Sequence, residues 1–171
     1  GGRRAWSWQF TASRIRKKLA AVLCLAGVVT LRNLAQARPV TLTTQLKNYG
    51  GDGAYLAIYV TDTNGLYKKT LWVSGKKSKY YKHLRDWARG SGLKAAEFDG
   101  VSGASVGSGK TLKVTVELAD VLIDSGHEIR IDSAVEDGRD NAADVRVPLT
   151  TQGAGKPAAG RGYVQSFTYG M

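Results

Sequence analysis

The chain has a single cysteine, Cys24, among its 171 residues. That cysteine lies in an apolar run near the N-terminus, and Leu23 precedes it where a lipoprotein signal would need a small residue. The rest of the chain can therefore form no disulfide, no thiolate nucleophile, and no zinc or iron–sulfur site built on sulfur. Its stability has to come from its core alone.

Histidine is nearly as scarce, with only His83 and His127 in the chain. Neither belongs to an H-E-x-x-H pattern. Residues 103–107 match G-x-S-x-G, but an alternating strand follows them, whereas a nucleophile elbow leads into a helix. His127 and Glu128 open an alternating run typical of a strand, whereas a zinc-binding histidine pair needs a helix. A hydrolase is therefore the least favoured class of function.

Acidic residues are absent from residues 1–37, which hold seven lysines and arginines. The basic stretch RIRKKL precedes an apolar run over residues 20–31, and the small-residue sequence AQA ends at Ala37. This order is typical of a secretory signal peptide, since the apolar run is too short to span a bilayer. We predict cleavage after Ala37, export to the periplasm and no membrane insertion of the mature protein. A retained N-terminal anchor is the alternative.

The positive charge is concentrated in that segment. The whole chain carries a net charge of +11, whereas residues 38–171 hold 18 Lys and Arg against 14 Asp and Glu, a net charge of +4. A basic pI would have favoured nucleic acid as a partner, but the predicted mature protein is only mildly basic. We therefore expect no nucleic-acid partner.

Short runs with a period of two recur through residues 38–150, and polar turns separate them. YLAIYVT over residues 55–61 is one such run, and Asn64 and Gly65 after it are typical of a hairpin turn. Six or seven such strands predict an all-β fold, an immunoglobulin-like antiparallel β-sandwich over residues 38–150. Residues 151–171 are predicted to be a flexible linker followed by a C-terminal strand.

One segment departs from this alternation. Apolar residues recur there at helical spacing, Ser78 is a suitable N-cap and Gly90 a suitable terminator. We predict one short amphipathic helix packed on an edge or end of the sandwich. Its apolar positions are Tyr80, Leu84, Trp87 and Ala88.

A glycine- and serine-rich stretch near the middle of the chain ends in GSGKT, as a phosphate-binding P-loop does. That pattern needs glycine at the position of Ala104, but Gly103 is one residue out of register. Thr111 also begins an alternating strand, whereas a P-loop continues into a helix. A nucleotide hydrolase is excluded on these grounds, and a flexible connecting loop stays open as an interpretation.

The first part of that stretch, DGVSGAS over residues 99–105, resembles the flavinylation motif D-x-x-[ST]-G-A-[ST] of exported electron-transfer proteins. The resemblance implies that a periplasmic flavin transferase attaches FMN by a phosphodiester bond to the last hydroxyl residue. That acceptor is Ser105, where threonine is commoner. The recognition element is then Asp99, Ser102, Gly103 and Ala104.

A wider resemblance covers residues 40–150. The runs over residues 55–87 and 127–140, together with the motif between them, resemble the DUF2271 family of predicted periplasmic proteins. The resemblance implies an immunoglobulin-like sandwich, and PepSY-type membrane reductases and flavin transferases as functional partners.

The two resemblances imply a periplasmic redox carrier with covalent FMN, rather than a self-contained enzyme. It would pass electrons from a PepSY-type membrane reductase to an acceptor outside the cytoplasm, such as ferric iron. The alternative is a non-enzymatic β-sandwich that serves as a binding or structural module of the cell envelope. In that alternative the acidic stretch EDGRDN over residues 136–141 would be a candidate calcium loop. Its spacing does not match the EF-hand pattern, and Asp-Gly between two strands is typical of a hairpin turn. The candidates for tuning a flavin are Lys76, Lys77, Tyr80, Tyr81, His83 and Trp87.

Overall fold

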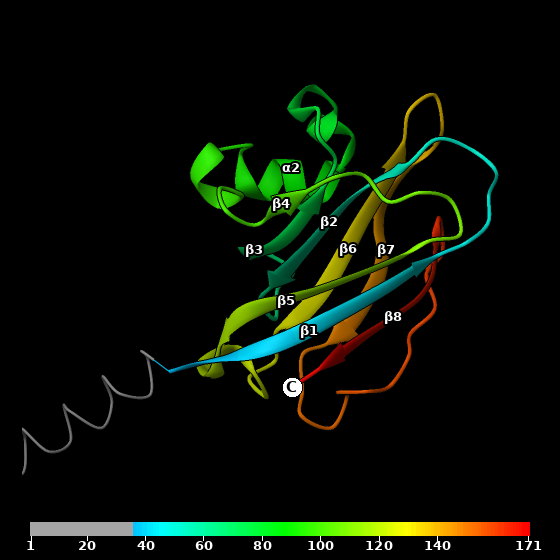
Figure 1. Cartoon of the computed structure of the whole chain (residues 1–171). Coiled ribbons are helices and arrows are strands. Elements are labelled where there is room, and N and C mark those ends of the chain that lie inside the picture. The colour runs from blue at the N-terminus through cyan, green and yellow to red at the C-terminus, as the bar shows by residue number, and fades with distance from the viewer. Residues whose placement is uncertain (1–35) are drawn as a thin grey trace, which may run out of the picture. The chain divides into compact units, whose positions relative to one another are not determined.

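The computed structural model describes residues 36–171, which form two β-sheets packed face to face (Figure 1). The signal peptide predicted for residues 1–37 thus falls outside the described residues, except for its last two positions. No helix within residues 36–171 has the length and apolar character needed to cross a membrane.

Eight strands make up the two sheets, and this confirms the predicted all-β sandwich. The smaller sheet has the order β5 (Thr111–Ala119), β1 (Ala37–Leu46) and β8 (Val164–Gly170). The larger has the order β4 (Ser102–Gly103), β3 (Tyr67–Ser74), β2 (Ala54–Thr61), β6 (Glu128–Val135) and β7 (Asp140–Pro148). One pair departs from the predicted antiparallel pattern, because the short edge strand β4 runs parallel to β3.

The inner core lies between the sheets and follows from the period-two pattern. Val40 and Leu42 of β1 point inward and are fully buried, as are Leu56 and Ile58 of β2. Because successive strand residues face opposite sides, each such run gives one apolar face to the interior.

The central strand β2 is buried along its whole length. Its alternate residues Tyr55, Ala57 and Tyr59 belong to a second core on the outer face of the larger sheet. There the helical segment between β3 and β4 covers them. The run YLAIYV has almost no polar residue, which is the pattern of a strand with protein on both faces.

The helical segment consists of two short pieces rather than the single predicted helix. A 3₁₀-helix, η1 (Ser78–His83), is followed by α2 (Arg85–Ser91), with the chain bent at Leu84. Ser78 is the first helical residue instead of the N-cap, and Gly92, not Gly90, ends α2 in the left-handed conformation. The remaining 3₁₀ turns are η2 (Ala95–Glu97) and η3 (Asp120–Leu122).

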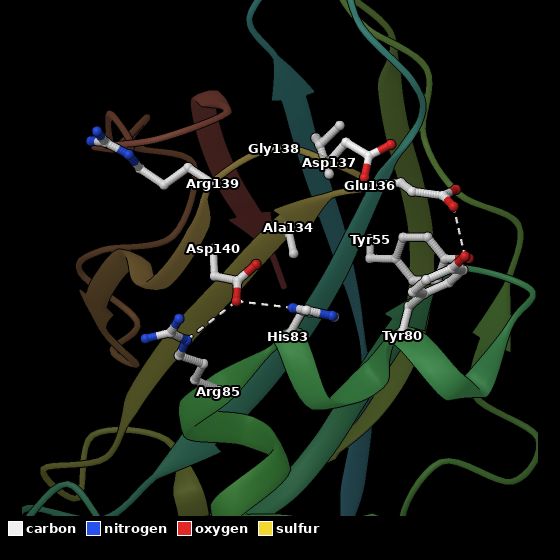
Figure 2. A pocket seen from close by; sticks show the side chains of 11 residues that line it. Tyr55, Tyr80, His83, Arg85, Ala134, Glu136, Asp137, Gly138, Arg139 and Asp140 are labelled. Atoms are coloured by element: carbon white, nitrogen blue, oxygen red, sulfur yellow. Dashed lines mark hydrogen bonds and ion pairs between the residues drawn. The ribbon is translucent and has the colours of Figure 1, made fainter.

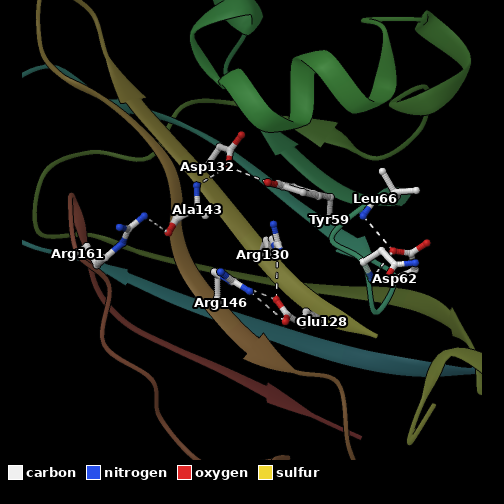
Figure 3. Close-up of polar contacts among 10 residues, drawn as sticks. Tyr59, Asp62, Leu66, Glu128, Arg130, Asp132, Ala143, Arg146 and Arg161 are labelled. Carbon is white, nitrogen blue, oxygen red and sulfur yellow. Dashed lines mark hydrogen bonds and ion pairs between the residues drawn. The ribbon is translucent and has the colours of Figure 1, made fainter. Parts of the chain in front are cut away.

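A buried carboxylate explains where α2 begins. Asp132 Oδ2 on β6 accepts a hydrogen bond of 2.8 Å from the backbone N–H of Trp87, in the first turn of α2. This is the N–H that an N-cap side chain would otherwise satisfy. The other oxygen, Oδ1, accepts from the Tyr59 hydroxyl at 2.9 Å and from Ala143 N at 2.8 Å (Figure 3). Burial raises the pKa of Asp132 above its usual value, against the effect of these hydrogen bonds.

A second buried carboxylate, Asp144, organises the segment before β8. Its oxygens accept from the backbone N–H groups of Gly162 and Val164 and from the Ser133 hydroxyl. Ala158 and Phe167 exchange two further backbone hydrogen bonds. The chain between β7 and β8 is therefore tied to the sandwich by these contacts, whereas the sequence predicts a flexible linker.

The outer face of β6 and β7 also carries a half-exposed ion cluster. Glu128 accepts from the guanidinium groups of Arg146 and Arg130 at 3.1–3.2 Å (Figure 3). The hydrogen bond from Arg146 and the two positive charges hold the pKa of Glu128 below its usual value. Pairs as exposed as these add little to stability.

Candidate functional site

The segment with the DGVSGAS sequence runs along the edge of the larger sheet, beside β3 (Figure 1). Its start is fixed by backbone hydrogen bonds from Asp99 N to Ala95 O and from Val101 N to Phe98 O. Two more bind it to β3: Val73 N donates to Val101 O at 2.9 Å, and Gly75 N donates to Gly103 O at 2.8 Å. The motif segment is thus held in place by backbone hydrogen bonds.

Beyond Gly103 the chain leaves β3 and crosses to the start of β2. Val106 and Ala54 exchange two backbone hydrogen bonds of 2.7 and 3.0 Å, and the Val106 side chain enters the inner core. Ser105 lies between these two attachment points and is exposed. The backbone on both sides of Ser105 is therefore fixed, while the residue itself is exposed.

Four of the five predicted site residues are exposed, and the fifth has a packing role. Asp99, Ser102, Ala104 and Ser105 are exposed, whereas Gly103 is half-buried. A Cβ atom on Gly103 would lie 2.7 Å from Cζ2 of Trp72. The glycine of the motif thus lets the edge strand approach the indole ring.

We expect Gly103→Ala to lower the free energy of unfolding by about 1–2 kcal/mol, because the new methyl group has to displace Trp72. Trp72→Leu in the same chain should recover most of this loss, and urea denaturation of the two single variants and the double variant measures the coupling. Gly170→Ala is the control, since nothing lies within 4 Å of its Cβ position. Equal losses with and without Trp72 would show that the indole ring is not the cause.

The following stretch, residues 107–110, is a tight turn rather than a flexible connection. Gly109 has a φ of +73° and donates its N–H to Lys47 O at 3.0 Å. The Ser108 hydroxyl accepts from Gly50 N and donates to the side chain of Asn48. Glycine is needed at position 109 because other residues rarely adopt this backbone conformation.

A cavity of about 570 Å³ opens on the outer face of the larger sheet, between η1 and the β6–β7 hairpin. Tyr55 and Tyr80 form its aromatic side, with ring centres 5.6 Å apart and an edge-to-face arrangement. Figure 2 shows Ala134 between this pair and Asp140 on the opposite side. This volume is in the range of small-molecule sites.

Charged groups line the rest of the cavity. Asp140 Oδ2 lies 3.0 Å from His83 Nδ1 and accepts from Arg85 Nε at 3.2 Å (Figure 2). Across the cavity, the Tyr80 hydroxyl donates to Glu136 Oε1 at 2.6 Å, and this hydrogen bond raises the pKa of Tyr80. The cavity therefore has an aromatic end and a polar end that offers both donors and acceptors.

The structure divides the residues proposed to tune a flavin into three groups. Tyr81 and Trp87 are buried in the outer core, where their polar atoms bond to Gly75 O and Thr70 Oγ1. Tyr80 and His83 line the cavity. Lys76 and Lys77 are exposed on the chain that leads into η1.

Sequence reasoning missed four other residues that line the cavity: Tyr55, Ala134, Glu136 and Asp140. The only signal was the acidic stretch 136–141, which the sequence identifies as a turn. It does connect β6 to β7, and Gly138 N donates to Val135 O there. Within residues 36–171, no group of three or more His, Cys, Asp or Glu side chains could hold a metal ion.

The cavity and the predicted modification segment both lie near the start of β2. A Cβ atom on Gly53 would lie 2.8 Å from Ser105 Oγ, and Tyr55 is two residues further along the same chain. Two residues of extended chain span about 7 Å. Gly75 also connects the motif segment to the cavity, because its N–H bonds to Gly103 O and its Cα packs against the Tyr55 ring.

Comparison with known proteins supports the family resemblance seen in the sequence. A family model described as predicted periplasmic protein (DUF2271) matches residues 37–166. No curated protein and no solved structure matches the chain.

Proposed function

Because the chain belongs to the DUF2271 family of predicted periplasmic proteins, we propose that it works in the periplasm as an electron-transfer protein with FMN bound covalently to Ser105. The single observation that carries this proposal is the placement of Ser105. Ser105 is an exposed residue at the end of a matching seven-residue motif, on a backbone fixed on both sides. An enzyme that attaches FMN needs access to the acceptor residue. An electron carrier benefits from a cofactor attached at a fixed point.

The residues around Ser105 fit a bulky phosphodiester. Ala104 and Ser102 are exposed and small, so they leave room for an enzyme's active site. Lys76 and Lys77 follow Gly75, which bonds to the motif, and they bring positive charge to this edge of the sheet. That charge favours a negatively charged phosphodiester. When bound, FMN supplies the capacity to accept and donate electrons, and the protein supplies its attachment and surroundings.

Attachment requires a separate flavin transferase and a donor in which FMN is joined to a nucleotide by a pyrophosphate bond. Ser105 Oγ forms a new bond to the FMN phosphorus, the pyrophosphate bond breaks, and the nucleoside monophosphate leaves. The hydroxyl proton is lost to the transferase or to water. In the proposed role, a PepSY-type membrane reductase then provides electrons, and an acceptor such as ferric iron receives them.

The test is the intact mass of the protein after co-expression in the periplasm with a flavin transferase. We expect a mass gain equal to FMN less one water, with yellow colour, and no gain in Ser105→Ala. Ser105→Thr should restore the modification, because it keeps a hydroxyl group in the position where the motif commonly has threonine. Ser108→Ala, three residues beyond the motif, is the matched control and should be modified like the wild type.

An unmodified mass in the presence of an active transferase would contradict the proposal. A mass gain that survives Ser105→Ala would move the attachment to another residue. In the first case the better hypothesis is the binding or structural module of the cell envelope.

A further inference from the structure

The cavity beside Tyr55 and Tyr80 has two chemically distinct ends. One end has the rings of Tyr55 and Tyr80, with the Glu136 carboxylate bonded to the Tyr80 hydroxyl, and the other has the Asp140 carboxylate with the side chains of His83 and Arg85. Ala134 lies between these ends and carries only a methyl group, so the middle of the cavity is open (Figure 2). A flat ligand with one apolar end and one polar end fits this arrangement.

The isoalloxazine ring of a flavin is such a ligand. Its dimethylbenzene part is apolar and stacks on aromatic side chains, while its pyrimidine part carries an N–H donor and carbonyl acceptors. Asp140 can accept from the N–H group, and Arg85 can donate to a carbonyl.

The cavity is also within reach of Ser105. The Ser105 hydroxyl lies against Gly53, and Tyr55 at the aromatic end is two residues further along the same chain. Residues 53 and 55 are about 7 Å apart in extended chain, so the attachment point and the aromatic end of the cavity are neighbours on the sheet. We infer that this cavity binds the isoalloxazine ring of the FMN attached to Ser105, an inference that rests on the proposed function.

The docked ring would be shielded from water on its tyrosine side and would lie near charged groups. Tyrosine rings in contact with a flavin quench its fluorescence, so docking has a direct optical signature. The same contact would hold the ring in one orientation relative to the sheet, and electron transfer to a partner would then occur from one defined face of the protein.

The test uses riboflavin, which has the ring and the ribityl chain but no phosphate. Riboflavin is titrated into the purified Ser105→Ala protein, so that no covalent flavin can fill the cavity. We expect saturable quenching of its fluorescence. Ala134→Phe in the same protein should weaken binding about tenfold or more, because the phenyl ring fills the middle of the cavity. Ala96→Phe, an exposed position on η2, is the matched control and should bind riboflavin unchanged.

A second variant keeps the test valid if Ala134→Phe does not fold. Tyr80→Leu removes the aromatic wall at a half-buried position and should weaken riboflavin binding several-fold, with the circular dichroism spectrum unchanged. In the modified wild-type protein, flavin fluorescence per FMN should be lower than in the modified Tyr80→Leu protein.

The outcomes distinguish failure of the cavity inference from failure of the proposed FMN attachment. Riboflavin that binds Ser105→Ala without a mass gain in the wild type would support the cavity as a flavin site and overturn FMN attachment. A mass gain without riboflavin binding, or with equal binding by both cavity variants, would overturn the cavity inference and leave FMN attachment standing.

Discussion

Replacing Asp132 with alanine is expected to lower the free energy of unfolding by about 3 kcal/mol or more. The change removes three hydrogen bonds at once, and each buried donor left without a partner costs about 1–3 kcal/mol. The donors are the backbone N–H groups of Trp87 and Ala143 and the Tyr59 hydroxyl. Two of them belong to parts of the chain far from β6 in sequence, so the loss should loosen the helical segment that forms one wall of the cavity.

Urea denaturation of wild type, Asp132→Ala and Asp132→Asn measures this effect. Asparagine keeps one acceptor oxygen but turns an N–H₂ group toward a donor, so we expect a smaller loss of about 1–2 kcal/mol. Asp52→Ala, at an exposed position, is the control and should change stability by no more than about 0.5 kcal/mol. A loss in Asp132→Ala as small as in this control would contradict the role given to the carboxylate.

The difference in stability between wild type and Asp132→Asn should depend on pH with a defined sign. The pKa of Asp132 is raised above 3.8 in the folded protein, chiefly by burial, so the folded state binds its proton more tightly than the unfolded state. The advantage of wild type over Asp132→Asn is therefore greatest below the unfolded pKa and declines as pH rises through the folded pKa. Denaturation at several pH values from about 4 to 7 tests this, and an advantage that grows with pH would be the opposite result.

Gly75→Ala is the second substitution for which we expect a large effect, again about 3 kcal/mol or more. Gly75 is buried with a φ of +132°, and a Cβ atom there would lie 2.0 Å from the Tyr55 ring. Backbone strain of about 1–3 kcal/mol therefore adds to an overpacking cost of similar size. The same residue donates to Gly103 O and accepts from the Tyr81 hydroxyl, so the motif segment and the cavity wall should both shift.

Gly50→Ala is a matched control that separates the two costs. Gly50 also has a positive φ of +74°, but nothing lies within 4 Å of its Cβ position. It should lose only about 1 kcal/mol from backbone strain. Thermal or urea denaturation of both variants, with Gly75→Ala also made in a Tyr55→Ala protein, measures the part due to the ring. If Gly75→Ala were no worse than Gly50→Ala, contact with Tyr55 would not limit this position.

The sequence alone determined the class of fold and the position of the candidate modification site. Strand periodicity is a local property, so alternating runs such as residues 111–118 predict strands without knowledge of their partners. A covalent modification motif is also local, because its seven residues are consecutive. The run YLAIYV over residues 55–60 even carried, in its near lack of polar residues, a signal that β2 is buried on both faces.

Only the tertiary structure decided what surrounds that site. Tyr80 and Glu136 are 56 residues apart, and Tyr59 and Asp132 are 73 residues apart, so neither pairing is visible in any local pattern. The first turn of α2, after Leu84, likewise donates to the carboxylate of Asp132 on a distant strand. Strand register is the physical reason: it brings the β6–β7 hairpin beside η1, and the small side chain of Ala134 leaves the space between them open.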